Sequence, residues 1–291
     1  MNKILEKIYS NPIRVFVYFL LRIFPNKIFH RKFYYHDKLH QKYFLLSFDC
    51  DVQEDLDCLD SILKRLKKIG IRSSVAIPGE LIEQNIDLIR SLLKKYEFEV
   101  INHGYFIHTE IYDDIYVSSR SYNDKLVKDI LEDIKKGHEV IKNLLNHEVK
   151  GFRTPHFGEI NFDIRKKINN FLLGYGYEYS SSTIYDHIFL NGPISNYKGI
   201  VELSVSGCAN NLYQILDSWT YLKSGSKIKN TFRNELQNIQ KLFIESDKVN
   251  YLNIYVDPSH VNDQEYFFDF LKELSNYSKY NLIEFAKKYK G

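Results

Sequence analysis

The chain has 291 residues, of which 44% are hydrophobic and 26% are charged, as in an ordinary soluble globular protein with enough apolar material for a core. A net charge of +3 does not decide whether nucleic acid is a partner. Three cysteines without CxxC spacing make neither a disulfide framework nor a thiolate zinc site, so we expect reduced thiols.

The positive charge is concentrated at the N-terminus. Residues 1–42 hold nine Lys or Arg against two acidic residues, a net charge of +7, which leaves −4 for the remainder. We therefore divide the chain into a basic, aromatic N-terminal extension (1–42) and one catalytic domain (43–291). Nucleic acid is not an expected partner, because the body is mildly acidic and the extension contains no recognisable nucleic-acid motif.

The extension contains an apolar segment, Val15 to Phe24, interrupted by Arg22. It falls far short of the roughly 20 residues that a spanning helix needs, and no small-residue cleavage site of a secretory signal follows it. The leading interpretation is a helix packed on the body. The alternatives are an interfacial helix on an anionic membrane surface, since basic and aromatic residues are interleaved, and a spanning anchor.

The body begins with an apolar run, Tyr43 to Phe48, that ends in Asp49-Cys50-Asp51. Side chains alternate along a strand, so Asp49 and Asp51 point to one face and Phe48 and Cys50 to the other. Carboxylates are costly to bury unless a cation, a proton or hydrogen-bond donors meet them. This strand end is therefore a predicted site.

Strands and helices then alternate along the chain. The patterns predict helices over 54–70, 80–96, 123–146, 161–175, 228–246 and 262–275, and strands over 72–77, 98–101, 149–153, 177–181, 199–205 and 249–256. This alternation indicates a parallel α/β sheet or barrel, in which chemistry lies at the carboxyl ends of strands. Asp49, Asp51, His103 and Arg153 all stand at such ends.

Six segments in the same order resemble the polysaccharide deacetylase family (NodB homology, carbohydrate esterase family 4), and more narrowly its branch with an Asp-x-Asp first motif. They are Ser47-Phe48-Asp49-Cys50-Asp51, Gly70 to Gly79, Phe98 to Tyr105, Gly151-Phe152-Arg153-Thr154-Pro155-His156-Phe157-Gly158, Gly176 to Ser182 and Val201 to Ser206. The resemblance implies an incomplete (β/α) barrel, here with a short basic helical extension. It also implies a divalent metal, most naturally zinc, and removal of acetyl groups from N-acetylated sugars.

The resemblance also implies roles for individual residues. Asp51, His103 and His108 would hold the metal, a ligand set suited to zinc. Asp49 would be the general base, and Arg153 would keep it ionised and oriented. The backbone N–H near His156 would stabilise the oxyanion. The substrate-binding set is Pro155, His156, Phe157 and Trp219.

The chain departs from the family pattern in two places. The second metal histidine usually follows the first by four residues, but His108 follows His103 by five, so a bulge is needed to bring it to the metal. The family's late His-Pro motif reads Asp257-Pro258 here, so the general acid is either Asp257 with a pKa raised by burial, or His260. Asp217-Ser218-Trp219 loosely resembles the family's later Asp/Trp motif.

The sequence thus predicts a hydrolase of non-peptide carbon–nitrogen bonds that deacetylates an N-acetylated sugar in a glycan or a lipid- or nucleotide-linked glycan precursor. Its expected location is cytoplasmic, with peripheral contact at the inner face of the membrane through residues 1–42. Two alternatives stay open. One is a hydrolase of the same fold that acts on another C–N bond, and the other is a catalytically silent carbohydrate-binding relative.

Overall fold

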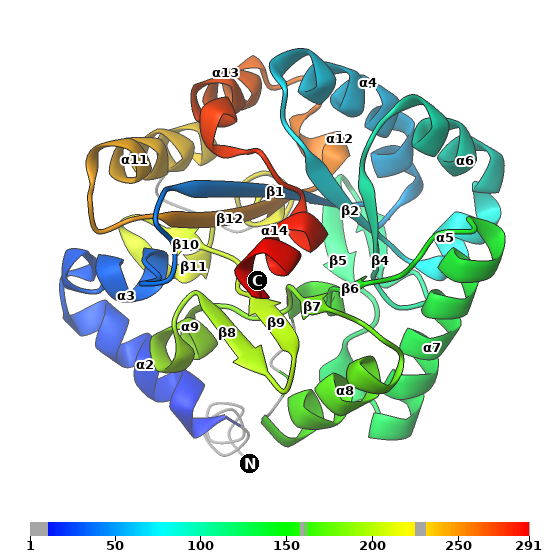
Figure 1. Ribbon diagram of the computed structural model, residues 1–291, viewed down its shortest axis with the longest axis horizontal. Helices are drawn as coiled ribbons and strands as arrows, with labels where there is room; N and C mark the ends of the chain where they lie inside the picture. Colours follow the sequence, from blue (N-terminus) through cyan, green and yellow to red (C-terminus); the bar gives the residue numbers. More distant parts are fainter. Residues whose placement is uncertain (1–10, 158–159, 161, 225–230, 291) are drawn as a thin grey trace.

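An eight-stranded curled sheet forms the centre of the computed structural model, with helices around its outer face (Figure 1). The structure describes residues 11–157, 160, 162–224 and 231–290. Position 161, residues 228–230 of the helix predicted over 228–246, Gly158 of the fourth motif and the first ten residues of the extension lie outside this range. The sheet has the order β12 (Tyr251–Val256), β1 (Tyr43–Asp49), β2 (Ser73–Ile77), β3 (Glu99–Asn102), β6 (Gly151–Phe152), β7 (Tyr179–Ser180), β9 (Ile200–Leu203) and β8 (Ile194–Tyr197).

All neighbouring strands in this sheet are parallel except β8, which pairs antiparallel with β9 at one edge. The helices that cover the sheet are α4 (Gln53–Ile69), α5 (Gly79–Gln84), α6 (Ile86–Lys95), α7 (Val127–Leu144), α8 (Phe162–Gly174), α9 (Tyr185–Asn191), α11 (Phe232–Glu245) and α13 (Glu265–Leu274). The predicted incomplete (β/α) barrel is confirmed. The antiparallel edge was not predicted, since residues 194–197 are too short a run to show a period.

One predicted helix is divided in two. The helix expected over 80–96 is interrupted at Asn85, whose backbone leaves the helical region (φ −129°, ψ 30°) between α5 and α6. The Asn85 side-chain amide donates to the Leu81 carbonyl at 3.1 Å, so it replaces a main-chain partner at the end of α5. Apolar periodicity alone does not reveal such a break.

The two faces of β1 show how the sheet separates core from site. Phe44, Leu46 and Phe48 point outward into the core beneath the helices, whereas Tyr43 and Leu45 point into the barrel. The barrel's amino end is closed by α14 (Leu282–Lys290), whose Phe285 ring lies 5.1 Å from that of Tyr43. Because one end is filled, Asp49 at the other end of β1 faces the open, carboxyl end of the barrel.

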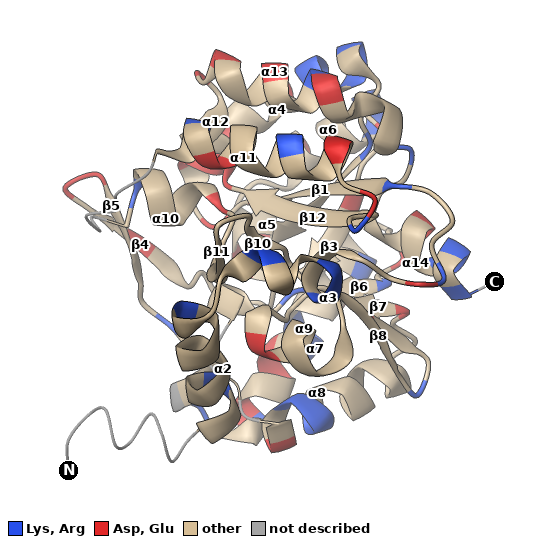
Figure 2. Ribbon diagram, turned by 90° about the vertical axis from the view of Figure 1, so that its left-hand side faces the viewer, with Lys and Arg blue, Asp and Glu red and all other residues tan. Residues whose placement is uncertain are grey.

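Four shorter elements surround that open end. They are the hairpin β4 (Thr109–Tyr112) with β5 (Ile115–Ser118), the hairpin β10 (Gly207–Cys208) with β11 (Asn211–Ile215), helix α10 (Ser218–Leu222) and helix α12 (Pro258–Val261). Figure 2 shows β4, β5 and α10 on the side of the molecule away from α14 and the C-terminus. These insertions, which the sequence patterns did not predict, build the walls of the site.

The described part of the basic extension, residues 11–42, packs on the body, as the leading interpretation predicted. Helix α2 (Pro12–Ile23) begins at Asn11, whose side chain accepts from the Arg14 amide at 3.1 Å. It buries Val17 and Leu21, and Tyr18 meets Tyr213 of β11 edge-on with ring centres 4.8 Å apart. A short turn (Asn26–Ile28) and α3 (His30–Tyr34) lead to β1. Within the described ranges, no helix combines the length and apolar character needed to cross a bilayer.

Candidate functional site

The site is built where β1 ends. Asp49 is the last residue of the strand, and Asp51 follows after one residue in the loop to α4. Both side chains are buried, with 3% and 8% of their residues' surface exposed, while Cys50 between them is directed into the outer core. The predicted alternation of faces is therefore what the structure shows. Two carboxylates are brought to the mouth of the barrel by strand geometry alone.

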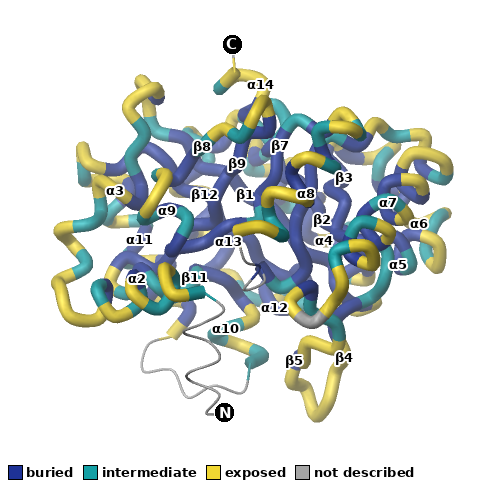
Figure 3. Tube along the Cα trace, turned by 90° about the horizontal axis from the view of Figure 1, so that it is seen from below, coloured by how far each residue is buried: buried dark blue, intermediate teal, exposed yellow. Residues whose placement is uncertain are grey.

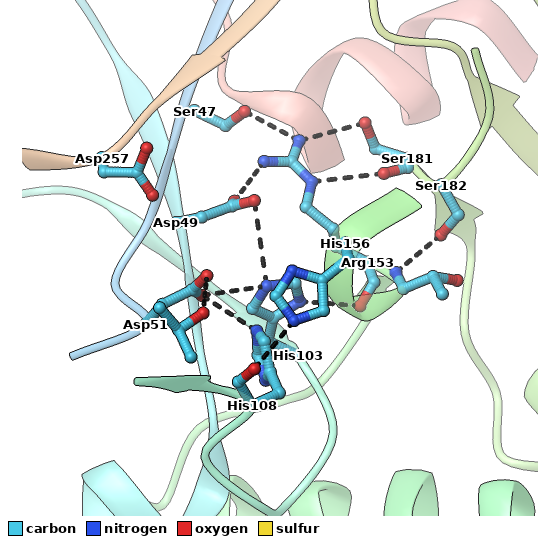
Figure 4. Close-up of polar contacts among 12 residues, drawn as sticks. Ser47, Asp49, Asp51, His103, His108, Arg153, His156, Ser181, Ser182 and Asp257 are labelled. Atoms are coloured by element: carbon cyan, nitrogen blue, oxygen red, sulfur yellow. Dashed lines mark hydrogen bonds and ion pairs between the residues drawn. The ribbon is translucent and has the colours of Figure 1, made fainter. Parts of the chain in front are cut away.

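The two histidines of the predicted ligand set meet Asp51. The Nε2 atoms of His103 and His108 lie 3.3 Å and 3.1 Å from Asp51 Oδ1 (Figure 4). One ligand atom from each of the three side chains falls within 4.8 Å of the others. In the part of the chain that the structure describes, this is the one cluster of His, Cys, Asp or Glu with such a spacing.

The five-residue spacing is accommodated by an irregular turn after β3. Gly104 has a φ of +81°, and a Cβ at this position would lie 2.4 Å from Asp133 Oδ2. Both the backbone conformation and the close approach of Asp133 therefore require glycine. The amides of Tyr105 and Phe106 then donate to Asp133 Oδ1 at 3.2 Å and 3.1 Å. This turn carries the chain far enough for His108, the residue before β4, to reach Asp51.

The protonation of the histidines fits a metal site. His103 Nδ1 lies 2.9 Å from the Arg153 carbonyl and His108 Nδ1 lies 3.3 Å from the Phe106 carbonyl, so both rings carry their proton on Nδ1 and direct a lone pair from Nε2. His103 Nε2 is buried and has no hydrogen-bond partner. Two lone pairs facing one carboxylate oxygen call for a cation between them, and a divalent metal of the zinc class fits this donor set.

The pKa shifts of Asp51 and His108 show that the two side chains attract one another. Burial by itself would raise the pKa of Asp51, but the charge of His108 and the close approach of both imidazoles hold this pKa well below its usual value. Burial would lower the pKa of His108, yet the Asp51 carboxylate outweighs it and the pKa is raised. Thr109 Oγ1 donates to the other oxygen of Asp51 at 3.0 Å, which orients the carboxylate.

Arg153 forms a buried ion pair with Asp49. Its guanidinium is fully buried and donates to Asp49 Oδ1 at 2.5 Å, to Ser47 Oγ at 2.8 Å, and to Ser181 through Oγ at 3.1 Å and the carbonyl at 3.2 Å. These contacts fix the position of the carboxylate, with its second oxygen 3.8 Å from His103 Nε2. The same arginine also accepts from His103 through its carbonyl, so it joins the two halves of this arrangement.

Asp49 and Asp51 line a cavity of about 160 Å³. Its walls include Trp219 of α10, Tyr116 of β5 and Asp257, the residue after β12. Of the predicted substrate-binding residues, His156, Phe157 and Trp219 face this cavity, whereas Pro155 is buried and does not line it. His156 adopts a left-handed backbone (φ +57°), and its Nε2 donates to the His108 carbonyl at 2.8 Å, so it supports the metal-site loop.

The two candidates for the general acid, Asp257 and His260, differ in whether they line the cavity. Asp257 lines the cavity, and its pKa is raised well above the usual value, first by burial and then by the charges of Asp51 and Asp49. His260 does not line the cavity; its Nδ1 lies 3.0 Å from Asp257 Oδ2, and burial lowers its pKa to about 4. Ser218 Oγ donates to Asp257 Oδ2 and accepts from the Asp257 amide, both at 2.9 Å.

Three residues at the site were not singled out from the sequence. Thr109 orients Asp51, Ser218 orients Asp257, and Asp55 accepts from the Asp51 amide at 3.1 Å and from Ser259 Oγ at 2.6 Å. Asp55 thus joins the metal loop to the loop that carries Asp257. Its position in the first turn of a predicted helix was a usable signal for a capping role, and Ser218 stands between the two residues that resemble the Asp/Trp motif, but Thr109 offered no signal.

Comparisons with known proteins agree with this geometry. Residues 36–176 match the model of the polysaccharide deacetylase family. No curated protein sequence is similar enough to count as a match.

Among solved structures, a Mycobacterium smegmatis protein described as a polysaccharide deacetylase superposes with a TM-score of 0.67 at 15% identity, over 89% of this chain and 93% of its own. The Bacillus subtilis peptidoglycan deacetylase PdaC gives 0.52 at 14%, over 86% and 92%. BA3943 of Bacillus anthracis, described as a CE4 family pseudoenzyme, gives 0.50 at 14%, over 85% and 66%. At these identities the similarity establishes the fold.

Proposed function

We propose that the chain, which matches the polysaccharide deacetylase family model over residues 36–176, is a metal-dependent deacetylase acting on an N-acetylated sugar of a glycan or glycan precursor. One observation carries the proposal. Asp51 of the Asp51, His103 and His108 trio and the Asp49 carboxylate paired with Arg153 line the same cavity, where a water would be close to both.

Asp51, His103 and His108 would hold a divalent cation, for which zinc is the natural choice given one carboxylate and two imidazoles. Such a cation lowers the pKa of a bound water and polarises an amide carbonyl. The chain's own contribution is to fix the three ligands. The Arg153 carbonyl, the Phe106 carbonyl and the Thr109 hydroxyl each hold one of them.

Asp49 would be the general base. Arg153 donates to this carboxylate and orients it, and the position of Asp49 on the cavity wall would let it take a proton from the attacking water. The water oxygen bonds to the acetyl carbon, and the backbone N–H of His156 stabilises the oxyanion that results.

Asp257 would complete the reaction. When the C–N bond breaks, the amine nitrogen needs a proton, and Asp257 is a cavity-lining carboxyl whose pKa burial raises well above its usual value. Acetate and the free amine leave. His260 and Ser218 hold the Asp257 carboxyl, so we assign His260 a positioning role.

The second candidate is a hydrolase of the same fold that acts on another non-peptide C–N bond. The observation that favours it is Asp257, because a carboxylic acid in place of an imidazole changes the group that meets the departing nitrogen. A catalytically silent carbohydrate-binding relative is the third outcome that an experiment must separate.

The test is acetate release from N-acetylated oligosaccharides by the zinc-loaded protein, with Asp49→Asn as the key variant. We expect Asp49→Asn to bind zinc as the wild type does and to lose a factor of about 10²–10⁴ in rate, which is the usual contribution of a general base. Release of acetate at the wild-type rate by Asp49→Asn refutes the mechanism. Zinc binding without turnover on any N-acetylated sugar favours the silent relative, and turnover of only other amides favours the second candidate.

A further inference from the structure

Helix α2 leaves one side of its surface apolar and exposed. Val17 and Leu21 face the body, whereas Ile13, Phe16, Phe19 and Ile23 recur at helical spacing on the side facing solvent. Phe16 is 62% exposed and Ile23 is 73% exposed. Phe24 and Ile28, 50% and 59% exposed, continue this apolar surface beyond the helix. Large exposed apolar patches on a folded protein mark interaction sites.

Basic side chains border this apolar surface. Arg22, Lys27, Arg31 and Lys32 are exposed, and Asp37 is the one acidic residue among the described residues 11–42. The apolar residues with these four basic ones are called the α2 face below. The combination of aromatic residues with a basic border is typical of a helix that lies in the plane of a membrane interface.

The α2 face shares a side of the molecule with the mouth of the cavity. Figures 2 and 3 both place α2, the β4–β5 hairpin and α10 on the side opposite the C-terminus. The hairpin and α10 line the cavity and also expose apolar side chains, among them Tyr112 at 58% and Trp219 at 40%. A flat surface held by α2 would therefore lie near the entrance to the site.

We propose that the α2 face binds the surface of an anionic lipid bilayer and brings the mouth of the cavity toward membrane-attached sugars. At 12 residues, α2 is about 18 Å long, too short to cross the apolar core of a bilayer, so it would lie in the interface. A second copy of the chain is the less suitable occupant, because two copies paired through this face would bring their basic borders together. Anionic headgroups complement that charge.

The vesicle experiment uses the full chain without substrate. Wild-type protein should sediment with vesicles of phosphatidylcholine that contain about one third phosphatidylglycerol, and much less with pure phosphatidylcholine, since each basic residue near an anionic surface contributes about fivefold. Phe16→Ser with Phe19→Ser should weaken binding at least about tenfold. The matched control, Leu88→Ser with Leu126→Ser, changes exposed leucines elsewhere and should bind as the wild type does.

A second pair of variants tests the charge. Lys27→Gln with Lys32→Gln should weaken binding to the anionic vesicles about 25-fold, whereas Lys64→Gln with Lys68→Gln, on exposed positions of α4, should leave it unchanged. Equal losses in both pairs would reduce the effect to net charge and overturn the assignment to the α2 face.

Orientation is tested with Trp219, which is the chain's one tryptophan. Brominated lipids should quench its fluorescence in bound protein if the mouth faces the bilayer, and the absence of quenching overturns that part of the proposal. Failure of the wild type to bind anionic vesicles overturns the whole. A wild-type dimer that is abolished by Phe16→Ser with Phe19→Ser would also overturn the whole proposal. Because no measurement here involves turnover, these outcomes are independent of the deacetylase proposal.

Discussion

Removal of the Arg153 guanidinium should cost more stability than any exposed ion pair of this protein. The perturbation is Arg153→Met, which has a similar length and no charge. It leaves the Asp49 carboxylate buried without its partner and leaves Ser47 and Ser181 without their donor. Loss of one partner from a buried ion pair costs about 3–5 kcal/mol, because the other charge stays desolvated and unpaired.

The matched control is Arg72→Met. Arg72 pairs with Glu284 at 2.7 Å, but the two side chains are 39% and 30% exposed, so water replaces the lost contact. Its cost should not exceed about 1 kcal/mol. Both variants are measured by urea unfolding in the presence of a chelator, since a bound metal would add its own stabilisation and obscure the comparison.

The reasoning is checked by a double-mutant cycle with Asp49→Asn. If the cost of Arg153→Met arises from the stranded carboxylate, the double variant should be more stable than the sum of the single losses predicts, by about 2–3 kcal/mol. Additive losses would show that Arg153 contributes through its contacts with Ser47 and Ser181 instead. A cost equal to that of Arg72→Met would refute the argument altogether.

Three further predictions concern the metal, the acid and a buried carboxyl. His108→Ala should weaken zinc binding by more than the 10- to 100-fold usual for a supporting residue, and calorimetry that finds a smaller loss would remove His108 from the ligand set. Asp257→Asn should lower the rate of amide hydrolysis by about 10²–10⁴ and remove the alkaline limb of the pH–rate profile, while Asp257→His should retain activity; an unchanged profile for Asp257→Asn excludes it as the acid. Burial raises the pKa of Glu99 from 4.5 to about 7, so the native state keeps a proton that the unfolded chain loses above pH 4.5. Stability should therefore fall by up to about 3 kcal/mol as the pH rises from 4.5 to 7, and urea unfolding of Glu99→Gln should show a flatter dependence.

Strand periodicity predicted that Asp49 and Asp51 share one face at a strand end, and the order of the family motifs turned this strand end into a predicted site. The run from Tyr43 to Asp51 gave both the strand and the direction of its carboxylates, because alternation is a property of the backbone. Parallel order of the strands then placed His103 and Arg153 at the same end. Local spacing gave the weakest support to His108. The approach of His108 to Asp51 depends on the left-handed backbone of Gly104 and on Asp133, which lies in a helix almost thirty residues later.

The residues that the sequence did not reveal act through contacts between distant segments. Ser47 of β1 and Ser181, the residue after β7, both accept from the Arg153 guanidinium, and Ser218 donates to Asp257, which is 39 residues away in the sequence. A serine in a strand or in a short helix carries no local signal of such a partner. The hairpin β4–β5 and helix α10 were not predicted for a related reason, because they are short and are stabilised by contact with one another. An example is the hydrogen bond from Trp219 Nε1 to the Tyr116 carbonyl at 2.9 Å.

Different contacts hold the two halves of the candidate site, and this bears on where the chain departs from the polysaccharide deacetylase pattern. The metal and base half is fixed by strand ends and by Arg153, which contacts the base through its guanidinium and His103 through its carbonyl. The acid half lies on the loop after β12 and is held by Ser218 and His260, neither of which touches the ligand trio. If Asp257 is the acid, its replacement of the imidazole would leave the proposed activation of water intact. Its consequence falls on the departing group, and it is greater for an amide, whose nitrogen must be protonated to leave, than for an ester oxygen, which leaves more readily without a proton.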